Sequence, residues 1–243
     1  MKQLQFTLLM LAIILVTACK KTKTPANEPY TCTTCKTAPD AKAANDASSK
    51  GIYKGVVIGS SGTITFDIAN NGTAITSVMI IDGITVNLTS AVTWVAGQAY
   101  VADFTGVLSG SPVTIRFSVG LSGATPTVTS STIPGHPNAS LTIVKETSTG
   151  LVECFEGTYS TTLPETGTLN IILSRTLSSW SAVARKTGTT ASGTVGNGTI
   201  VNNKLIDPAQ NNNSIGTINA DKIDGSFVDG NGKTVTVTCK RTL

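Results

Sequence analysis

Apolar and polar side chains alternate at every second position in many short stretches after residue 50. Clear examples are residues 63–68, 113–119 and 234–238. A period of two is typical of a β-strand with one buried face and one solvated face. No stretch shows a convincing helical period. The pattern therefore predicts antiparallel strands and excludes helical bundles and parallel βαβ folds.

Pairs that favour tight hairpin turns separate these stretches. Each pair is Asn-Gly or Asp-Gly, which tolerates the positive φ angles that two-residue hairpins need. The chain is also rich in threonine, a strand-forming residue. Short strands joined by such turns predict an all-β fold, either an up-and-down barrel or a sandwich. The pairs begin at Asn71, Asp82, Asn197, Asp224, Asp229 and Asn231.

Two parts of the chain follow a similar plan. Residues 52–55 match residues 154–157, with Gly55 on Gly157, and residues 143–147 match residues 238–242, with Val144 on Cys239. This predicts two tandem antiparallel β units. The aromatic-x-Gly openings and the size of each unit resemble small lipocalin-like (calycin-type) barrels, which implies a barrel architecture. The predicted domains are residues 51–149 and 150–243.

The N-terminus has the organisation of a secretory signal. Lys2 precedes an apolar run at residues 6–16, which is too short to span a bilayer as a helix. The following Val16-Thr17-Ala18-Cys19 resembles the lipobox of bacterial, Bacteroidetes-like lipoproteins. The resemblance implies a type II signal peptide at residues 1–18 and a palmitate-bearing Cys19 that anchors the chain to a membrane by lipid. In bacterial lipoproteins an Asp directly after the acylated Cys retains the protein in the inner membrane, so Lys20 implies the outer membrane. Lipoproteins exported to the cell surface have acidic residues after the Cys, whereas residues 20–23 here are Lys-Lys-Thr-Lys. The resemblance therefore implies a position that faces the periplasm, with the cell surface as the alternative.

Residues 19–50 are polar, contain prolines and show no hydrophobic periodicity, so they predict a flexible tether. Within them, Cys32 and Cys35 are expected to form a local disulfide, because an envelope protein lies in an oxidising compartment. A metal-binding or redox role for this Cys-x-x-Cys pair stays open.

The remaining cysteines suggest a second disulfide. Cys154 lies on the predicted first strand of the second unit and Cys239 on its last strand. The first and last strands of a closed barrel pair, and cross-strand neighbours can lie within disulfide range. We therefore expect a Cys154–Cys239 disulfide, with two buried free thiols as the alternative.

Catalytic and metal-binding patterns are weak. The one histidine, His136, lies between Pro134 and Pro137 in a predicted exposed loop. No G-x-S-x-G elbow occurs, and the carboxylates form no obvious pair. We therefore predict no catalytic residue, no metal site and no cofactor.

The net charge of the two predicted β units limits the classes of partner that the protein can have. Residues 51–243 hold 11 basic and 11 acidic residues, so nucleic-acid binding is not expected. The sequence predicts a lipid-anchored, non-enzymatic envelope module that binds an unknown protein, glycan or small molecule. The alternative functions are a small-molecule carrier with a barrel cavity and an envelope hydrolase.

Overall fold

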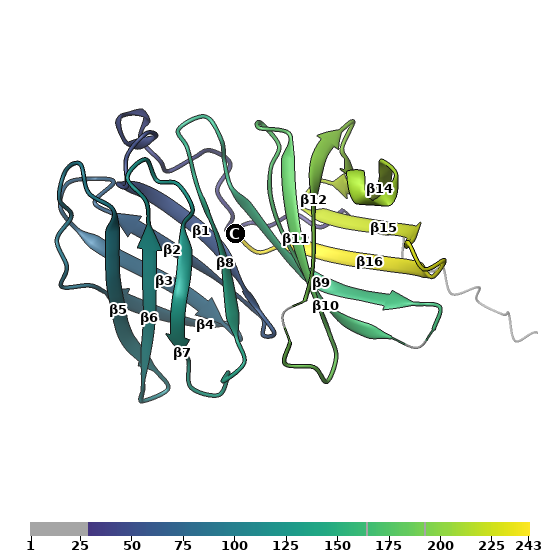
Figure 1. The fold of residues 1–243 in the computed structure, drawn as a ribbon, viewed down its shortest axis with the longest axis horizontal. Helices are drawn as coiled ribbons and strands as arrows, with labels where there is room; N and C mark the ends of the chain where they lie inside the picture. The colour runs from purple at the N-terminus through teal and green to yellow at the C-terminus, as the bar shows by residue number, and fades with distance from the viewer. Residues whose placement is uncertain (1–28, 164, 192) are drawn as a thin grey trace, which may run out of the picture.

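The computed structural model describes residues 29–163, 165–191 and 193–243, and it is all-β. Two antiparallel units of eight strands follow one another along the chain and lie side by side (Figure 1). The predicted fold class is confirmed. Domain 1 contains β1 (Gly51–Ile58), β2 (Gly62–Ile68), β3 (Ile75–Ile81), β4 (Ile84–Thr89), β5 (Tyr100–Leu108), β6 (Ser111–Val119), β7 (Thr127–Thr132) and β8 (Ser140–Lys145). Domain 2 contains β9 (Glu153–Thr161), β10 (Thr166–Ser174), β11 (Ser179–Lys186), β12 (Thr194–Val201), β13 (Lys204–Asp207), β14 (Asn213–Asn219), β15 (Lys222–Val228) and β16 (Thr234–Arg241).

Both units are up-and-down meanders in which the first and last strands pair. In domain 1 the strand order is β7-β6-β5-β4-β3-β2-β1-β8, and in domain 2 the strands form a closed barrel that β16 and β9 complete. Every strand pair of the described chain is antiparallel, as tight hairpins require. The predicted boundary near residue 149 falls between β8 and β9.

Large apolar side chains fill the inside of each unit. In domain 1 the rings of Phe66 and Phe117 stack with centroids 4.5 Å apart, and Tyr53 and Phe104 pack edge-on against this pair. The inward-facing side chains of domain 2 are mostly aliphatic, with Phe155 and Trp180 among them. Both interiors are therefore packed cores.

A glycine on the first strand of each unit allows the last strand to approach closely. Gly55 pairs with Ile143, and Gly157 pairs with Cys239. A Cβ at Gly157 would lie 1.9 Å from the Thr238 carbonyl oxygen, so no larger residue fits without displacement. The equivalence of the two glycines is confirmed. The residue equivalent to Cys239 is Ile143, one position before the Val144 that the sequence alignment matched to it.

The two domains share an apolar interface. All eight residues of β1 are buried, because both faces of this strand are covered. Its inner face packs against the core of domain 1, and its outer face packs against domain 2. Val56 and Ile58 of β1 contact Cys154 and Ile172 of the second barrel in this interface. The C-terminus lies at the junction, where the Leu243 carbonyl accepts a hydrogen bond from the Cys154 backbone N–H (Figure 1).

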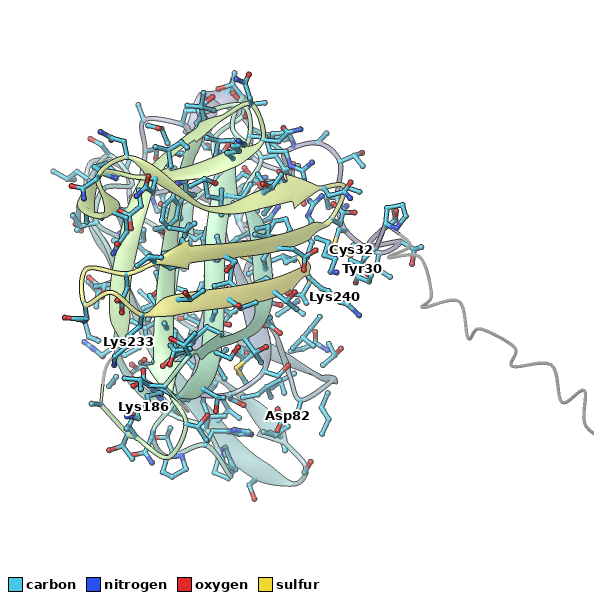
Figure 2. The ribbon with its side chains drawn as sticks, turned by 90° about the vertical axis from the view of Figure 1, so that its right-hand side faces the viewer. Tyr30, Cys32, Asp82, Lys186, Lys233 and Lys240 are labelled. Atoms are coloured by element: carbon cyan, nitrogen blue, oxygen red, sulfur yellow. A yellow bond between two sulfur atoms is a disulfide. The ribbon has the colours of Figure 1, made fainter. Side chains whose placement is uncertain are left out.

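Residues 29–50, here named the strap, are bound to both domains. The Tyr30 hydroxyl donates to the Arg241 carbonyl oxygen in domain 2, while the buried Asn45 amide, in the 3₁₀ helix η1 (Ala43–Asn45), donates to Asn70 in domain 1. Figure 2 shows Tyr30 beside Lys240, whose ammonium lies 5.1 Å from the ring centroid. The prediction of a flexible tether is therefore wrong for residues 29–50, because hydrogen bonds hold a segment that has no apolar face.

The rest of the predicted N-terminal organisation, including the signal peptide at residues 1–18 and Cys19, lies outside the described residues. Within the described ranges, no helix has both the length and the apolar character needed to cross a membrane.

Candidate ligand-binding site

The predicted local disulfide is confirmed: Cys32 and Cys35 are bonded to each other within the strap. The backbone N–H of Cys32 donates to the Asp221 carboxylate at 2.9 Å, which fastens the disulfide loop to domain 2. The loop therefore has a structural position that the sequence did not indicate.

The predicted Cys154–Cys239 disulfide is wrong, since both thiols are free and buried. Strands β9 and β16 pair as expected, but their register places Gly157 opposite Cys239 and leaves Cys154 three residues away. Side chains alternate along a strand, so Cys239 points into the barrel and Cys154 points out toward domain 1. Burial raises the pKa of each thiol to about 12.

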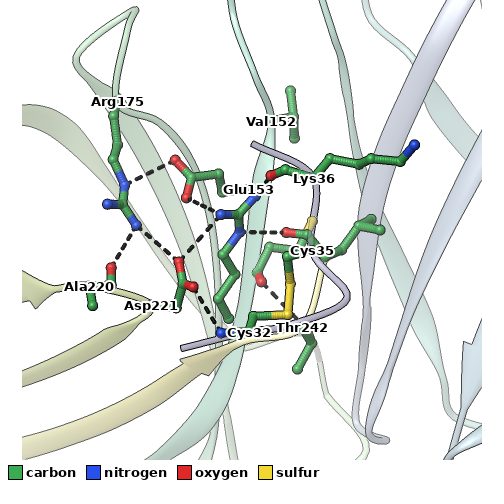
Figure 3. Close-up of polar contacts among 12 residues, drawn as sticks. Cys32, Cys35, Lys36, Val152, Glu153, Arg175, Ala220, Asp221 and Thr242 are labelled. Atoms are coloured by element: carbon green, nitrogen blue, oxygen red, sulfur yellow. Dashed lines mark hydrogen bonds and ion pairs between the residues drawn. A yellow bond between two sulfur atoms is a disulfide. The ribbon is translucent and has the colours of Figure 1, made fainter. Parts of the chain in front are cut away.

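A group of four charged side chains, here named the charge cluster, lies beneath the disulfide loop (Figure 3). Glu153, which begins β9, contacts Arg175 at 3.0 Å and Arg241 at 3.1 Å. Asp221 contacts the same two guanidinium groups, at 3.5 and 3.3 Å. Burial raises the pKa of Glu153, while the two arginines act in the opposite direction.

The charge cluster is internally compensated and is tied to the strap. Arg241 also donates to the Lys36 carbonyl oxygen at 2.6 Å, and Arg175 donates to the Ala220 carbonyl oxygen at 2.7 Å. Two positive and two negative charges thus compensate one another and hold the strap against domain 2. The charge cluster therefore has a structural role, which is to hold the strap to domain 2.

A different polar region forms where hairpin ends of domain 1 meet the outer face of domain 2. Glu156 on β9 accepts hydrogen bonds from the Gly62 backbone N–H at 2.8 Å and from the Ser61 hydroxyl at 3.2 Å. Both donors belong to the hairpin that joins β1 and β2. Burial raises the pKa of Glu156, and the nearby negative charge of Asp82 adds to this effect.

Arg185 on β11 holds a second loop of domain 1. Its guanidinium donates to the Asn138 carbonyl oxygen at 2.6 Å and to the Ser140 hydroxyl at 3.0 Å. Arg185 is buried, so these bonds lie within the junction and not on its rim. Glu156 and Arg185 together position the hairpin and the β7–β8 loop over strands β9, β10 and β11.

Three buried polar atoms in this region have no hydrogen-bond partner among the described residues: Asn170 Nδ2, Thr168 Oγ1 and Arg185 Nε. The sheet register places Asn170 beside Glu156, and Thr168 beside Arg185. A hollow of about 390 Å³ opens next to Asn170 and Thr168. We name it the junction pocket; its walls include Ser60, Glu156, Thr168, Asn170 and Lys240.

Ser60, in the wall of this pocket, is in contact with Asp82 and His136. The Ser60 Oγ is 2.9 Å from His136 Nδ1, and His136 Nε2 is 3.4 Å from Asp82 Oδ2. The other Asp82 oxygen lies 3.3 Å from the Ser60 hydroxyl. The His136 side chain is only 18% exposed, so the predicted exposed loop histidine is instead a partly buried member of a polar group.

The order of the turns along the sequence could have indicated that Ser60, Asp82 and His136 meet. In an up-and-down meander, alternate turns lie at the same end of the sheet. The β1–β2 turn, the β3–β4 turn and the β7–β8 loop therefore gather together, and they carry Ser60, Asp82 and His136 respectively.

No protein-family model matches this chain, and searches of curated proteins and of solved structures find no significant match to it.

Proposed function

We propose that this chain is a lipid-anchored protein of the bacterial cell envelope that binds a polar ligand in the junction pocket. The lipobox-like residues 16–19 support the anchor. The Cys32–Cys35 disulfide supports an oxidising compartment, because such bonds persist outside the cytosol. The outer membrane, facing the periplasm, is the location that Lys20 favours, with the cell surface as the alternative.

The observation that carries the ligand proposal is the gathering of unpartnered polar atoms around the junction pocket. Buried polar groups are almost always hydrogen-bonded, so Asn170 Nδ2 and Thr168 Oγ1, both in the pocket wall, require a partner that the described chain does not supply. A bound polar molecule, or water that such a molecule displaces, would satisfy them.

The wall of the pocket indicates the class of ligand. Lys240, Glu156 and Asn170 lie side by side on β16, β9 and β10. The Lys240 ammonium lies over the Tyr30 ring, while Glu156 and Asn170 supply a carboxylate and an amide to the pocket wall. Neighbouring strands are about 4.8 Å apart, so these two groups place hydrogen-bond donors and acceptors close together. Sugar hydroxyls both donate and accept, and we propose a saccharide among the protein, glycan and small-molecule ligands that the sequence leaves open.

The packed interiors of the two units argue against a barrel carrier. The inside of domain 1 holds the rings of Tyr53, Phe66, Phe104 and Phe117, in contact with one another. A lipocalin-like barrel that carries a ligand needs an open interior. The surface junction is therefore the better supported place for a ligand.

Native mass spectrometry tests the ligand proposal. Residues 20–243, produced in a bacterial periplasm, would be examined directly and after addition of oligosaccharides of hexoses and of N-acetylhexosamines. We expect a saccharide adduct that disappears in Asn170→Ala and persists in Asn87→Ala, an exposed strand residue of domain 1. Absence of any saccharide adduct, or equal adducts in both variants, contradicts the junction site.

Metabolic labelling tests the anchor. In the full-length chain we expect incorporation of radioactive palmitate and retention in the membrane fraction. Cys19→Ala should abolish both without changing the fold of the two domains. Palmitate that persists in this variant contradicts the lipobox assignment.

A further inference from the structure

Ser60, His136 and Asp82 form a hydroxyl–imidazole–carboxylate group from three separate turns of domain 1. The Ser60 hydroxyl is 2.9 Å from His136 Nδ1 and 3.3 Å from Asp82 Oδ1, and Asp82 Oδ2 is 3.4 Å from His136 Nε2. The shorter of the two hydroxyl contacts is that of a serine nucleophile with its base. Such a constellation is recognised by its geometry and not by the order of its residues in the chain.

The chemistry of this contact follows from the imidazole. A carboxylate near Nε2 favours the tautomer with the proton on that nitrogen, which leaves the Nδ1 lone pair directed at the Ser60 hydroxyl. A lone pair in this position can accept the hydroxyl proton as the oxygen attacks. Asp82 would then act as a positioning residue for His136.

Ser60 lies between two hollows of different character. On one side is the junction pocket, with its polar wall. On the other, Asp82 and His136 border a hollow of about 290 Å³, here named the apolar hollow, whose walls include Ile81, Ile84, Leu108 and Pro134. A substrate lying across Ser60 would place an apolar part in one hollow and a polar part in the other.

Hydrogen-bond donors are also present in the turn. The backbone N–H groups of Ser60 and Ser61 belong to this turn, between β1 and β2. In serine hydrolases, the backbone N–H of the residue after the nucleophile stabilises the developing oxyanion. The Ser61 N–H occupies that place in the sequence.

We propose that Ser60 is the nucleophile of an esterase activity toward carboxylic esters that join a short apolar acyl group to a polar, hydroxyl-bearing alcohol. The alcohol part of this inference rests on the proposed function of the junction pocket. O-acylated saccharides have this chemistry, with the acyl group in the apolar hollow.

The reaction balances without any further reagent than water. Ser60 Oγ bonds to the ester carbonyl carbon while its proton passes to His136 Nδ1. The bond between that carbon and the alcohol oxygen breaks, and the alcohol leaves with the proton. Water then attacks the acyl-serine and gives a proton to Nδ1, after which the carboxylic acid is released and the Ser60 hydroxyl is restored.

The test uses residues 20–243 and a fluorophosphonate, which forms a stable adduct with activated serines. Intact mass and peptide mapping should show one adduct, on Ser60. Ser60→Ala should lose it, and Ser130→Ala, which removes an exposed hydroxyl on β7 away from the site, should keep it. Unchanged circular dichroism and Tm would show that the variants are folded. An adduct that survives Ser60→Ala, or its absence from the unsubstituted chain, overturns the proposal.

Hydrolysis of p-nitrophenyl acetate and butyrate provides the second readout. We expect His136→Gln to lower kcat by about 100-fold or more, in line with loss of a general base. Asp82→Asn should lower kcat with KM unchanged, which a merely structural role would not produce. Saccharide binding with neither a Ser60 adduct nor ester hydrolysis above that of Ser60→Ala would overturn the nucleophile while leaving the pocket proposal standing.

Discussion

The Lys54 ammonium lies 2.6 Å from the Glu146 carboxylate, and both side chains are almost fully buried between the strap and the two domains. Glu146 follows β8, and its oxygens also accept hydrogen bonds from the backbone N–H groups of Asp40 and Val152. One carboxylate thus joins the strap, the first strand of domain 1 and the entry to domain 2. It explains how a polar segment stays in place without an apolar face.

Glu146→Gln should therefore destabilise the protein strongly. It removes the nearest charge partner of the buried Lys54 ammonium and leaves only the Asp40 carboxylate, 3.9 Å away. Breaking a buried pair typically costs about 3–5 kcal/mol. Lys54→Met combined with Glu146→Gln should recover part of the loss. Urea unfolding measures both, and Asp103→Asn, which breaks the exposed Arg116–Asp103 pair, should cost at most about 1 kcal/mol. Equal losses in the buried and exposed pairs would contradict the joining role of Glu146.

Cysteine alkylation should separate the five cysteines into distinct classes. In Cys19→Ala, Cys154 and Cys239 should resist alkylation at pH 8 while the protein is folded, because burial raises the pKa of each thiol to about 12. After denaturation without reductant, both should react, and Cys32 and Cys35 should react only after reduction. Intact mass gives the count. If Cys154 and Cys239 react only after reduction, the two are bonded to each other and the thiols are not free.

Removal of the strap disulfide should loosen the strap locally. Replacing Cys32 and Cys35 by serine frees a four-residue loop, for which the chain-entropy formula gives about 2 kcal/mol. Hydrogen exchange should rise at residues 29–41, where the loop is held to Asp221 and Arg241, and should change little in β5 and β6. Uniform protection along the strap would show that the disulfide does not hold it.

Gly157→Ala should disturb the seam of the second barrel. The added Cβ would meet the Thr238 carbonyl oxygen at 1.9 Å and Cys239 Sγ at 2.8 Å, and such overpacking costs roughly 1–3 kcal/mol or more. Gly230→Ala is the matched control, because nothing lies within 4 Å of a Cβ built there. Thermal unfolding should separate the two variants, and similar Tm values would contradict this close approach.

Glu156 should make stability depend on pH. Burial raises its pKa above the ordinary value of 4.5, so the folded state binds the proton more tightly than the unfolded state. This contribution to the free energy of unfolding is present below pH 4.5 and is lost as the pH rises through the raised pKa. Glu156→Gln should flatten the pH dependence of unfolding in that window. An unchanged slope would show that Glu156 does not titrate differently on folding.

The sequence predicted the parts of this fold that depend on local pattern. Alternation and turn dipeptides indicate the strands, and a meander of tight hairpins pairs the first strand with the last. The sequence does not determine the register between β9 and β16. A shift of a few residues leaves the alternating pattern intact but separates Cys154 from Cys239.

The candidate site depends on contacts between residues far apart in the chain. Ser60 and His136 are 76 residues apart, and Glu156 reaches a hairpin of the other domain. Neither residue type nor spacing marks these contacts. The strap was missed for a related reason, since hydrogen bonds to Asn70, Glu146 and Arg241 order it and leave no hydrophobic signature.

The bound strap also limits how far the domains can lie from a membrane. If Cys19 carries the lipid, the ten Cα–Cα steps from Cys19 to Pro29 can reach at most about 35 Å even when fully extended. The strap enters the body at Tyr30 and Cys32, beside the charge cluster of domain 2. The end of domain 2 near that cluster must then stay within this distance of the bilayer surface, which limits how far the rest of the body can extend from it.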